Sequence, residues 1–340
     1  MYRFWILIIA LSGVISCSNK GSDPAGDAPS NLTLQITEKE AGSGTYIFEA
    51  KADNALSYEI NFGNNQKEVS KTGKVEYTYP IAGKYTVTAT ARSANGITIS
   101  KREELEFSRP EKLVWADEFN VPGGLDSKKW THEIGNGENG WGNAEKQYYT
   151  DRSANSYISD GTLKIKLIME NYEGFGYTSA RIVTRGKFDF TYGRVEIRAK
   201  VPVGKGTWPA GWLLGSNYQT KIWPACGEID ILEHVGKQLN TIHGTLHYPE
   251  HHGENATTKT TELATATTNF HVYSVDWNKD EIIFKVDGKA YHTFKSSPQY
   301  PFHHDFFIIL NMAMGGYFGG DVDPSINEAI YEIDYVRVYQ

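Results

Sequence analysis

Short segments of alternating apolar and polar residues dominate the last two thirds of this chain. In residues 194–201, apolar side chains at the odd positions alternate with charged side chains at the even positions. Ile282, Phe284 and Val286 supply apolar side chains at every second position just before Asp287-Gly288, a pair typical of two-residue hairpins. Because strand side chains point to opposite faces in turn, these segments predict half-buried strands and no long helix. We therefore expect an all-β sandwich of two antiparallel sheets over residues 110–340.

A second, smaller β-domain is expected before this region. Residues 32–108 contain short strand-like runs, of which Tyr85–Ala91 alternates most clearly, separated by turns such as Gly63–Asn65. A chain of 340 residues is long enough for two domains of roughly 100–200 residues each. The sequence thus predicts a small immunoglobulin-like β-sandwich, a linker near residue 109, and a larger domain over residues 110–340.

The N-terminus has the pattern of a bacterial lipoprotein signal. Arg3 precedes the apolar segment Phe4–Leu11, which is too short to span a bilayer, and Val14–Cys17 is similar to a lipobox. We expect residues 1–17 to be the signal peptide, Cys17 to be acylated and residues 18–31 to form a flexible tether. This predicts a protein anchored in the bacterial cell envelope, at the outer membrane or cell surface. The alternative is ordinary signal cleavage, in which Cys17 has no special role.

Charge and cysteine content exclude several classes of partner and crosslink. The net charge of −7 does not favour a nucleic-acid partner. Only Cys17 and Cys226 are present, so acylation of Cys17 would leave Cys226 without a disulfide partner. We expect a monomer.

The segment Glu228–Glu233 places three carboxylates within six residues, interleaved with apolar residues. On a strand Glu228 and Asp230 share a face, whereas strict alternation would send Glu233 to the apolar face, where a lone carboxylate is costly. A β-bulge near Leu232 would return Glu233 to the side of its partners. This spacing alone is expected about 0.6 times by chance in a chain of this composition, so its context has to support it.

That context resembles a known family. Trp223–Gly236 resembles the active-site strand of glycoside hydrolase family 16 in its bulged, laminarinase-like form. Further similar segments occur in the family's order along nearly all of the second region: 113–120, 140–150, 177–186, 206–215, 311–316 and 333–339. The resemblance implies a β-jelly roll whose concave sheet forms a substrate cleft. Residues 75–80 and 83–88 of the small domain resemble a polycystic-kidney-disease (PKD) module, either a spacer or a weak glycan-binding unit.

The resemblance implies a role for each acid. Glu228 is the nucleophile, Glu233 is the general acid and base, and Asp230 tunes the pair. The spacing of the two glutamates is compatible with the retaining mechanism, which needs carboxyls about 5–5.5 Å apart. No cofactor is needed for catalysis.

The resemblance also implies a set of substrate-binding residues. The tryptophans would stack on sugar rings, and the remaining side chains would contact hydroxyl groups. His247 could instead be a packing residue, and the His251-His252 pair is better interpreted as a polar loop than as a metal site. The expected substrate-binding residues are Trp208, Trp212, Trp223, His247, Asn143 and Arg181.

A structural calcium ion is a further expectation from the resemblance. The matching groups are Glu118, a backbone carbonyl near Gly161, and the side chain of Asp334. Oxygen ligands of this kind suit calcium. The alternative is an ordinary salt bridge at Asp334.

The expected function is that of a retaining endo-β-1,3-glucanase acting on a β-glucan polysaccharide. Two other enzyme activities remain open, hydrolysis of mixed-linkage β-1,3-1,4-glucan and agarase-like hydrolysis of a galactan. A surface glycan-binding protein on a hydrolase scaffold is an alternative from another class, although the presence of both glutamates argues against it.

Overall fold

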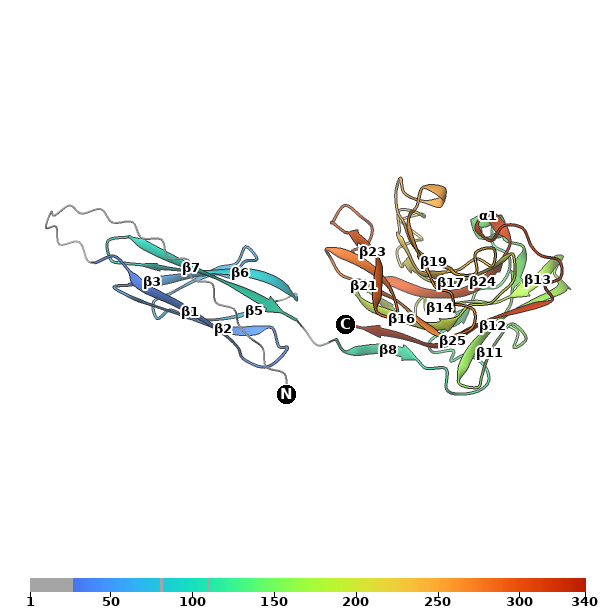
Figure 1. Ribbon diagram of the computed structural model, residues 1–340, viewed down its shortest axis with the longest axis horizontal. Helices are drawn as coiled ribbons and strands as arrows, with labels where there is room; N and C mark the ends of the chain where they lie inside the picture. The colour runs from blue at the N-terminus through green and yellow to red at the C-terminus, as the bar shows by residue number, and fades with distance from the viewer. Residues whose placement is uncertain (1–26, 80–81, 109–110) are drawn as a thin grey trace. The chain divides into compact units, whose positions relative to one another are not determined.

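The computed structural model of the chain describes residues 27–79, 82–108 and 111–340. Cys17, the expected signal peptide and most of the expected tether lie outside these ranges. The chain divides into two compact units, Met1–Pro110 and Glu111–Gln340, both built of β-strands (Figure 1). Among the described residues, no helix has the length and apolar character needed to cross a membrane.

The first unit contains two antiparallel sheets around one apolar core. Phe48, Ile60 and Val87 are fully buried in this core, which draws residues from both sheets. The buried hydroxyl of Tyr79 donates a 2.9 Å hydrogen bond to the carbonyl of Phe62. The three-stranded sheet has the order β1 (Ser30–Glu38), β2 (Thr45–Asp53), β5 (Lys74–Thr78), and the four-stranded sheet has the order β4 (Lys67–Ser70), β3 (Ser57–Asn61), β6 (Gly83–Arg92), β7 (Thr98–Phe107).

The second unit is a sandwich, and its first layer is a ten-stranded sheet. The expected alternation over residues 194–201 is present, because Val195, Ile197 and Ala199 are fully buried. The expected hairpin at Asp287-Gly288 also joins two paired strands. The main path runs β10 (Gln147–Tyr149), β13 (Phe175–Ser179), β12 (Thr162–Tyr172), β25 (Glu328–Tyr339), β16 (Gly193–Lys200), β21 (His271–Trp277), β22 (Glu281–Val286), β23 (Lys289–Lys295); β11 (Ser156–Ser159) pairs with β12 and β8 (Leu113–Asp117) with β25.

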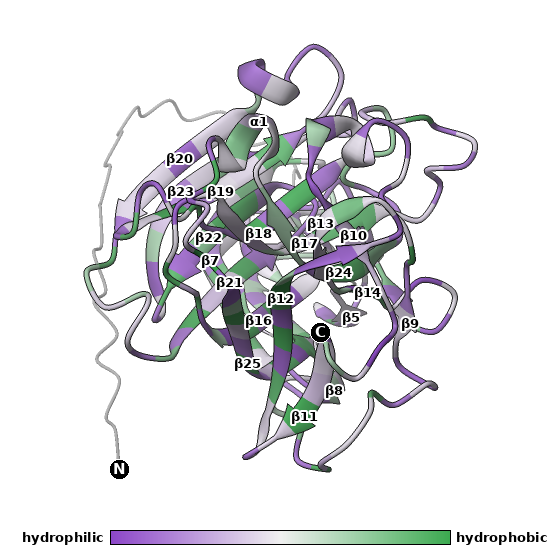
Figure 2. Cartoon of the chain, turned by 90° about the vertical axis from the view of Figure 1, so that its right-hand side faces the viewer, coloured by the Kyte–Doolittle hydropathy of each residue, from purple (hydrophilic) through white to green (hydrophobic). Residues whose placement is uncertain are grey.

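The second layer is an eight-stranded sheet that carries the acidic segment. Its strands β20, β19, β18 and β17 lie side by side (Figure 2). The path runs β20 (Thr257–Glu262), β19 (Thr241–His247), β18 (Glu228–Glu233), β17 (Thr207–Gly215), β24 (Phe306–Met314), β14 (Arg181–Val183), β9 (Thr131–His132), and β15 (Asp189–Phe190) pairs with β24. Helical segments are short: α1 (Gly316–Gly319), a turn at Gly140–Ala144 and another at Gly253–Asn255.

One apolar core joins the inner faces of the two layers. Ile197 and Tyr331 contribute from the ten-stranded sheet, and Ile229 and Leu310 from the eight-stranded sheet. Burial of such side chains stabilises the fold by roughly 1.5–3 kcal/mol each. The core confirms the expected all-β sandwich, and it leaves the opposite face of β18 free for polar side chains.

A β-bulge interrupts β18, as expected. On the β17 side Leu232 pairs with Gly211 and Asp230 with Trp212, so Ile231 is the additional residue. Ile231 and Leu232 both belong to the core, as does Ile229. The bulge therefore returns Glu233 to the outer face, where Glu228 and Asp230 lie.

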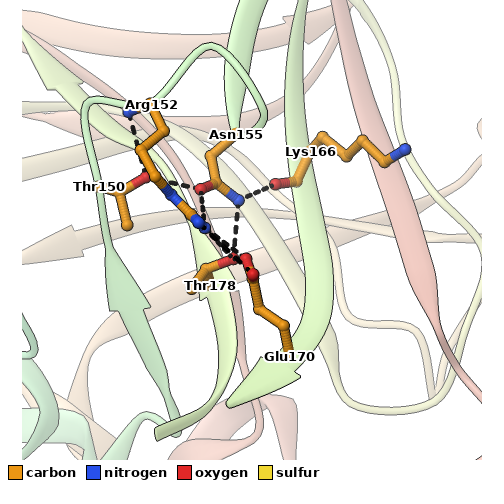
Figure 3. A network of polar contacts seen from close by, with 6 residues as sticks. All are labelled: Thr150, Arg152, Asn155, Lys166, Glu170 and Thr178. Carbon is orange, nitrogen blue, oxygen red and sulfur yellow. Dashed lines mark hydrogen bonds and ion pairs between the residues drawn. The ribbon is translucent and has the colours of Figure 1, made fainter. Parts of the chain in front are cut away.

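A polar network supports the segment that follows the Gly140–Ala144 turn (Figure 3). The Arg152 guanidinium donates to Asn155 and Thr178 over 3.0 Å each and pairs with Glu170. The members of this network come from the segment after β10 and from β12 and β13: Thr150, Arg152, Asn155, Lys166, Glu170 and Thr178. These contacts tie the loop after β10 to the ten-stranded sheet.

Gly244 is sensitive to substitution because the side chains of Phe284 and Tyr291 pack closely against it. Gly244 lies in β19 between the partners of Asp230 and Glu233, and an added Cβ would lie 2.4 Å from the Tyr291 hydroxyl. We expect Gly244→Ala to lower the free energy of unfolding by about 1–3 kcal/mol, because the surrounding core has to shift. Chemical denaturation should show no comparable loss for Gly124→Ala, whose Cβ would meet nothing within 4 Å. Equal losses in both variants would contradict this packing.

Candidate active site

The three acids of β18 meet three residues of β19 on the outer face. In the strand register Glu228 faces His247, Asp230 faces Thr245, and Glu233 faces His243. Asp230 and Glu233 are almost completely buried on this face, at 3% and 8% exposure. Neighbouring side chains therefore control the charge of each acid.

Glu228 is held by a tryptophan and lies near a histidine. The indole Nε1 of Trp223 donates a 2.9 Å hydrogen bond to Oε2 of Glu228. The Nε2 atom of His247 lies 3.7 Å from the other carboxylate oxygen. The Trp223 ring lies against His247 and His252 and is 43% exposed, so it has surface available for a sugar ring.

His247 also contacts Asp230, whose Oδ2 lies 3.2 Å from the His247 Nε2. Burial alone would lower the pKa of His247, but Glu228, Asp230 and Glu233 together raise it to about 10. The Gly253 amide lies 3.2 Å from Nδ1 and could donate to it only if that nitrogen were unprotonated. The neighbouring acids favour the protonated form of His247, whose positive charge compensates part of the acidic charge.

Glu233 has a different set of partners. Trp208 Nε1 donates to Oε1 over 3.1 Å, and the Thr245 hydroxyl donates to Oε2 over 3.1 Å. Burial raises the pKa of Glu233, and the charge of Glu228 adds to the effect, while His247 and the two donors oppose it. Burial, with the charges of Glu228 and Glu233, raises the pKa of Asp230 well above its usual range. A buried acid that keeps its proton beside a more exposed carboxylate is the arrangement needed for a general acid and a nucleophile.

The other expected substrate contacts form a second cluster. The Arg181 guanidinium lies between two indole rings, 4.3 Å from the Trp141 centroid and 4.9 Å from the Trp212 centroid. Its Nε donates to Glu133 over 2.6 Å. Asn143 lies beside Trp141 and donates to the Glu145 carboxylate over 3.3 Å. The six expected residues thus divide between two clusters, with Trp208, Trp223 and His247 at the acids.

A buried hydrogen-bond chain underlies the second cluster. Trp212 Nε1 donates to Asn311 over 2.8 Å, Asn311 donates to the Tyr149 hydroxyl over 3.0 Å, and that hydroxyl donates to Glu145 over 3.2 Å. Burial raises the pKa of Glu145. The Arg181 charge and hydrogen bonds from Gln147, Asn143 and Tyr149 oppose this rise. This series of hydrogen bonds fixes the orientation of the Trp212 ring.

Comparison with known proteins places this geometry in a family. The model of glycosyl hydrolases family 16 matches residues 143–337, more than half of the chain. The chain belongs to glycosyl hydrolases family 16. A β-glucanase of Rhodothermus marinus is 44% identical over 245 residues, which cover 67% of this chain and 85% of that protein.

Other relatives of this family 16 chain are also named as enzymes that act on glucans. Glucan endo-1,3-beta-glucosidase A1 of Niallia circulans is 36% identical over 279 residues, 71% of this chain but 41% of the relative. The X-ray structure of the laminarinase from Rhodothermus marinus superposes with a TM-score of 0.65 and 43% identity, covering 68% of this chain and 98% of that one. The matches confirm a glycoside hydrolase with the jelly-roll fold, and enzymes of family 16 act with retention.

The expected calcium ligands of this family 16 chain have other partners. Both carboxylate oxygens of Glu118 accept from Arg337 over 2.8 Å, and Asp334 pairs with Arg198. Carboxylates occupied by arginines do not fit an oxygen-only calcium shell. In the part of the chain that the structure describes, only Glu228, Asp230 and His247 cluster tightly enough to suggest a metal, and we assign them to proton chemistry.

Several site residues were not expected from the sequence. Thr245 contacts Glu233, while Trp141, Glu145 and Asn311 support the second cluster. The sequence offered signals for three of them, since Trp141 and Glu145 lie within the 140–150 segment and Asn311 within the 311–316 segment that resemble the family. The contact partners of Asn311 depend on strand order and could not be inferred.

Removal of the His247 charge should change the pH profile of this family 16 enzyme. His247 lowers the pKa of Glu233 and of Asp230, so His247→Gln should raise both. Because a general acid works only when protonated, the basic limb of kcat/KM should move to higher pH, and kcat should fall about tenfold or more. A pH series from 4 to 10 would measure this, with melting temperature as the folding control. An unchanged basic limb would contradict the assigned charge balance.

Proposed function

We propose that the chain is an endo-β-1,3-glucanase that cleaves laminarin-type β-glucan and retains the anomeric configuration. The observation that carries the proposal is the placement of Glu228 and Glu233 on one face across the bulge, each with its own indole donor. The named activities of the β-glucanase, glucan endo-1,3-beta-glucosidase and laminarinase relatives support the choice of substrate. The two tryptophans beside the acids suit the stacking of glucose rings.

The reaction follows from the assigned roles. Glu228 attacks the anomeric carbon and forms a covalent glycosyl-enzyme, while Glu233 gives its proton to the leaving glycosidic oxygen. Glu233 then removes a proton from water, which attacks the anomeric carbon and releases Glu228. Glu233 ends the cycle protonated, so no external acid or cofactor is consumed. Asp230 lies between the two glutamates in the strand and, with His247, adjusts their charge.

Glu228→Gln should abolish turnover without unfolding the protein. The amide keeps the size of the side chain but cannot act as a carboxylate nucleophile, so the rate on laminarin should fall by about 10³-fold or more. Reducing-sugar release measures turnover, and circular dichroism with melting temperature measures folding. Normal turnover in a folded variant would contradict the assignment.

Substrate choice is tested on the same enzyme preparation. We expect the wild-type protein to release oligosaccharides from laminarin faster than from barley mixed-linkage glucan, and to leave agarose intact. Preferential cleavage of barley glucan or agarose would favour the alternative substrates. Binding to laminarin without any product would favour a glycan-binding protein.

We further propose that the protein is a monomer on the bacterial envelope, tethered through acylated Cys17. The support is the pattern Val14–Cys17 after a short apolar segment. The small domain would serve as a PKD-like spacer between tether and catalytic domain. The calcium ion expected at Glu118, Gly161 and Asp334 stays a prediction, and its binding would require both carboxylates to leave their arginine partners.

Cys17→Ala should move the enzyme from the membrane fraction to the soluble fraction of a bacterial host. A serine or alanine at this position cannot form the thioether to which the lipid is attached. Fractionation followed by metabolic labelling with a radioactive fatty acid measures the change, and Cys226→Ala is the matched control. Equal membrane association of the Cys17→Ala variant would contradict the anchor.

A further inference from the structure

The two oxygens of the Glu233 carboxyl have partners of different kinds. Oε1 accepts from the indole Nε1 of Trp208, and Oε2 accepts from the hydroxyl of Thr245, both over 3.1 Å. An indole N–H can only donate, whereas a threonine hydroxyl can donate or accept. Only the Thr245 contact can therefore adapt when Glu233 gains or loses its proton.

Thr245 is itself connected to a second hydroxyl. Thr258 Oγ1 lies 3.1 Å from Thr245 Oγ1 and donates to it. Thr245 is 4% exposed, whereas Thr258 is exposed on β20, the last strand in the order of its sheet. Two hydroxyls thus lead from the buried carboxyl of β18 to an exposed residue of β20. Strand β19 lies between β18 and β20 (Figure 2).

We propose that Thr245 and Thr258 are positioning residues, which form a hydroxyl pair that orients Glu233 and follows its change of charge during turnover. When Glu233 is ionised, Thr258 donates to Thr245 and Thr245 donates to the carboxylate. When Glu233 is protonated, both hydroxyls rotate, so that Thr245 accepts from the acid and Thr258 accepts from Thr245. The inference rests on the proposed function of Glu233 as acid and base.

The pair requires no net proton transfer to solvent. Glu233 gives one proton to the leaving oxygen and regains one from the attacking water. Between these steps it carries a negative charge in a buried site, where an unsatisfied carboxylate oxygen is costly. Hydroxyl rotation supplies a donor at that stage without moving heavy atoms, and solvent at Thr258 completes the chain.

Other groups also act on the charge of Glu233, and the test has to separate them. Glu228 raises its pKa, whereas His247 and the Trp208 donor lower it. Glu233 in turn affects two further ionisable groups, Asp230 in its own strand and Tyr291 in β23. His243 faces Glu233 across the strands, and burial lowers its pKa to about 4, so it is neutral and adds no charge. None of these groups is altered by substitution at Thr245 or Thr258.

The principal test compares Thr245→Val with Thr245→Ser. Valine keeps the shape but removes the hydroxyl that stabilises ionised Glu233, so the pKa of Glu233 should rise. The basic limb of kcat/KM on laminarin should move to higher pH, and kcat/KM at neutral pH should fall on the order of tenfold. Serine keeps the hydroxyl and should stay within about twofold of the wild type. A serine variant as impaired as the valine variant would overturn the proposal.

Thr258→Val tests the second hydroxyl on an exposed strand, where loss of folding is not expected. It should move the basic limb in the same direction as Thr245→Val, by a smaller amount. The matched control is Thr260→Val, which alters an exposed threonine on the same face of β20 and should change nothing. An effect of Thr260→Val equal to that of Thr258→Val would contradict the pair.

A substrate with an activated leaving group provides a further readout. A dinitrophenyl β-glucoside does not need protonation of its leaving oxygen, and kcat/KM reports the step up to release of that group. Thr245→Val should therefore lower kcat/KM on laminarin but leave kcat/KM on the dinitrophenyl substrate within about twofold. Equal losses on both substrates would indicate a merely structural role and would overturn the proposal.

A titration without substrate separates this inference from the proposed function. Infrared difference spectra against Glu233→Gln follow protonation of the Glu233 carboxyl as pH changes. Thr245→Val should raise its midpoint, and Thr245→Ser should restore it. An unchanged midpoint would overturn the hydroxyl pair while the glucanase proposal stands. Failure of the wild-type protein to cleave laminarin, with the midpoint shifted as expected, would overturn the glucanase proposal but not the contact of the hydroxyl pair with Glu233.

Discussion

A strand that carries Glu228 and Glu233 five positions apart cannot present both on one face if its alternation is regular. The bulge at Ile231 removes this conflict, because the additional residue and Leu232 both enter the core. The two sheets can then close over a continuous apolar interior while all three acids stay on the outer face. Core packing and placement of the acids thus depend on the same irregularity.

The acids on that face are tolerated because their charges are unequal. Burial favours the protonated forms of Asp230 and Glu233, while the His247 cation limits this effect. Indole donors hold Glu228 and Glu233 separately, through Trp223 and Trp208. A pair of carboxyls with different surroundings is the physical requirement for one nucleophile and one acid in the same site.

Much of the fold and the placement of the three acids on one face could be predicted from the sequence, since both depend on local patterns. The alternation over residues 194–201, the Asp287-Gly288 hairpin and the position of the bulge are confirmed. Contacts across strands could not be predicted, because they require the strand order and register. The division of the substrate residues into two clusters and the arginine partners of Glu118 and Asp334 belong to this group.

The central claim is that the bulge brings Glu228 and Glu233 to one face, where their different surroundings make Glu228 the nucleophile and Glu233 the acid. The most direct measurement is to trap the glycosyl-enzyme with a 2-deoxy-2-fluoro glycoside of laminaribiose and to map the labelled peptide by mass spectrometry. The account predicts a single label on Glu228 in the wild-type protein. A label on Asp230 or Glu233 would contradict it.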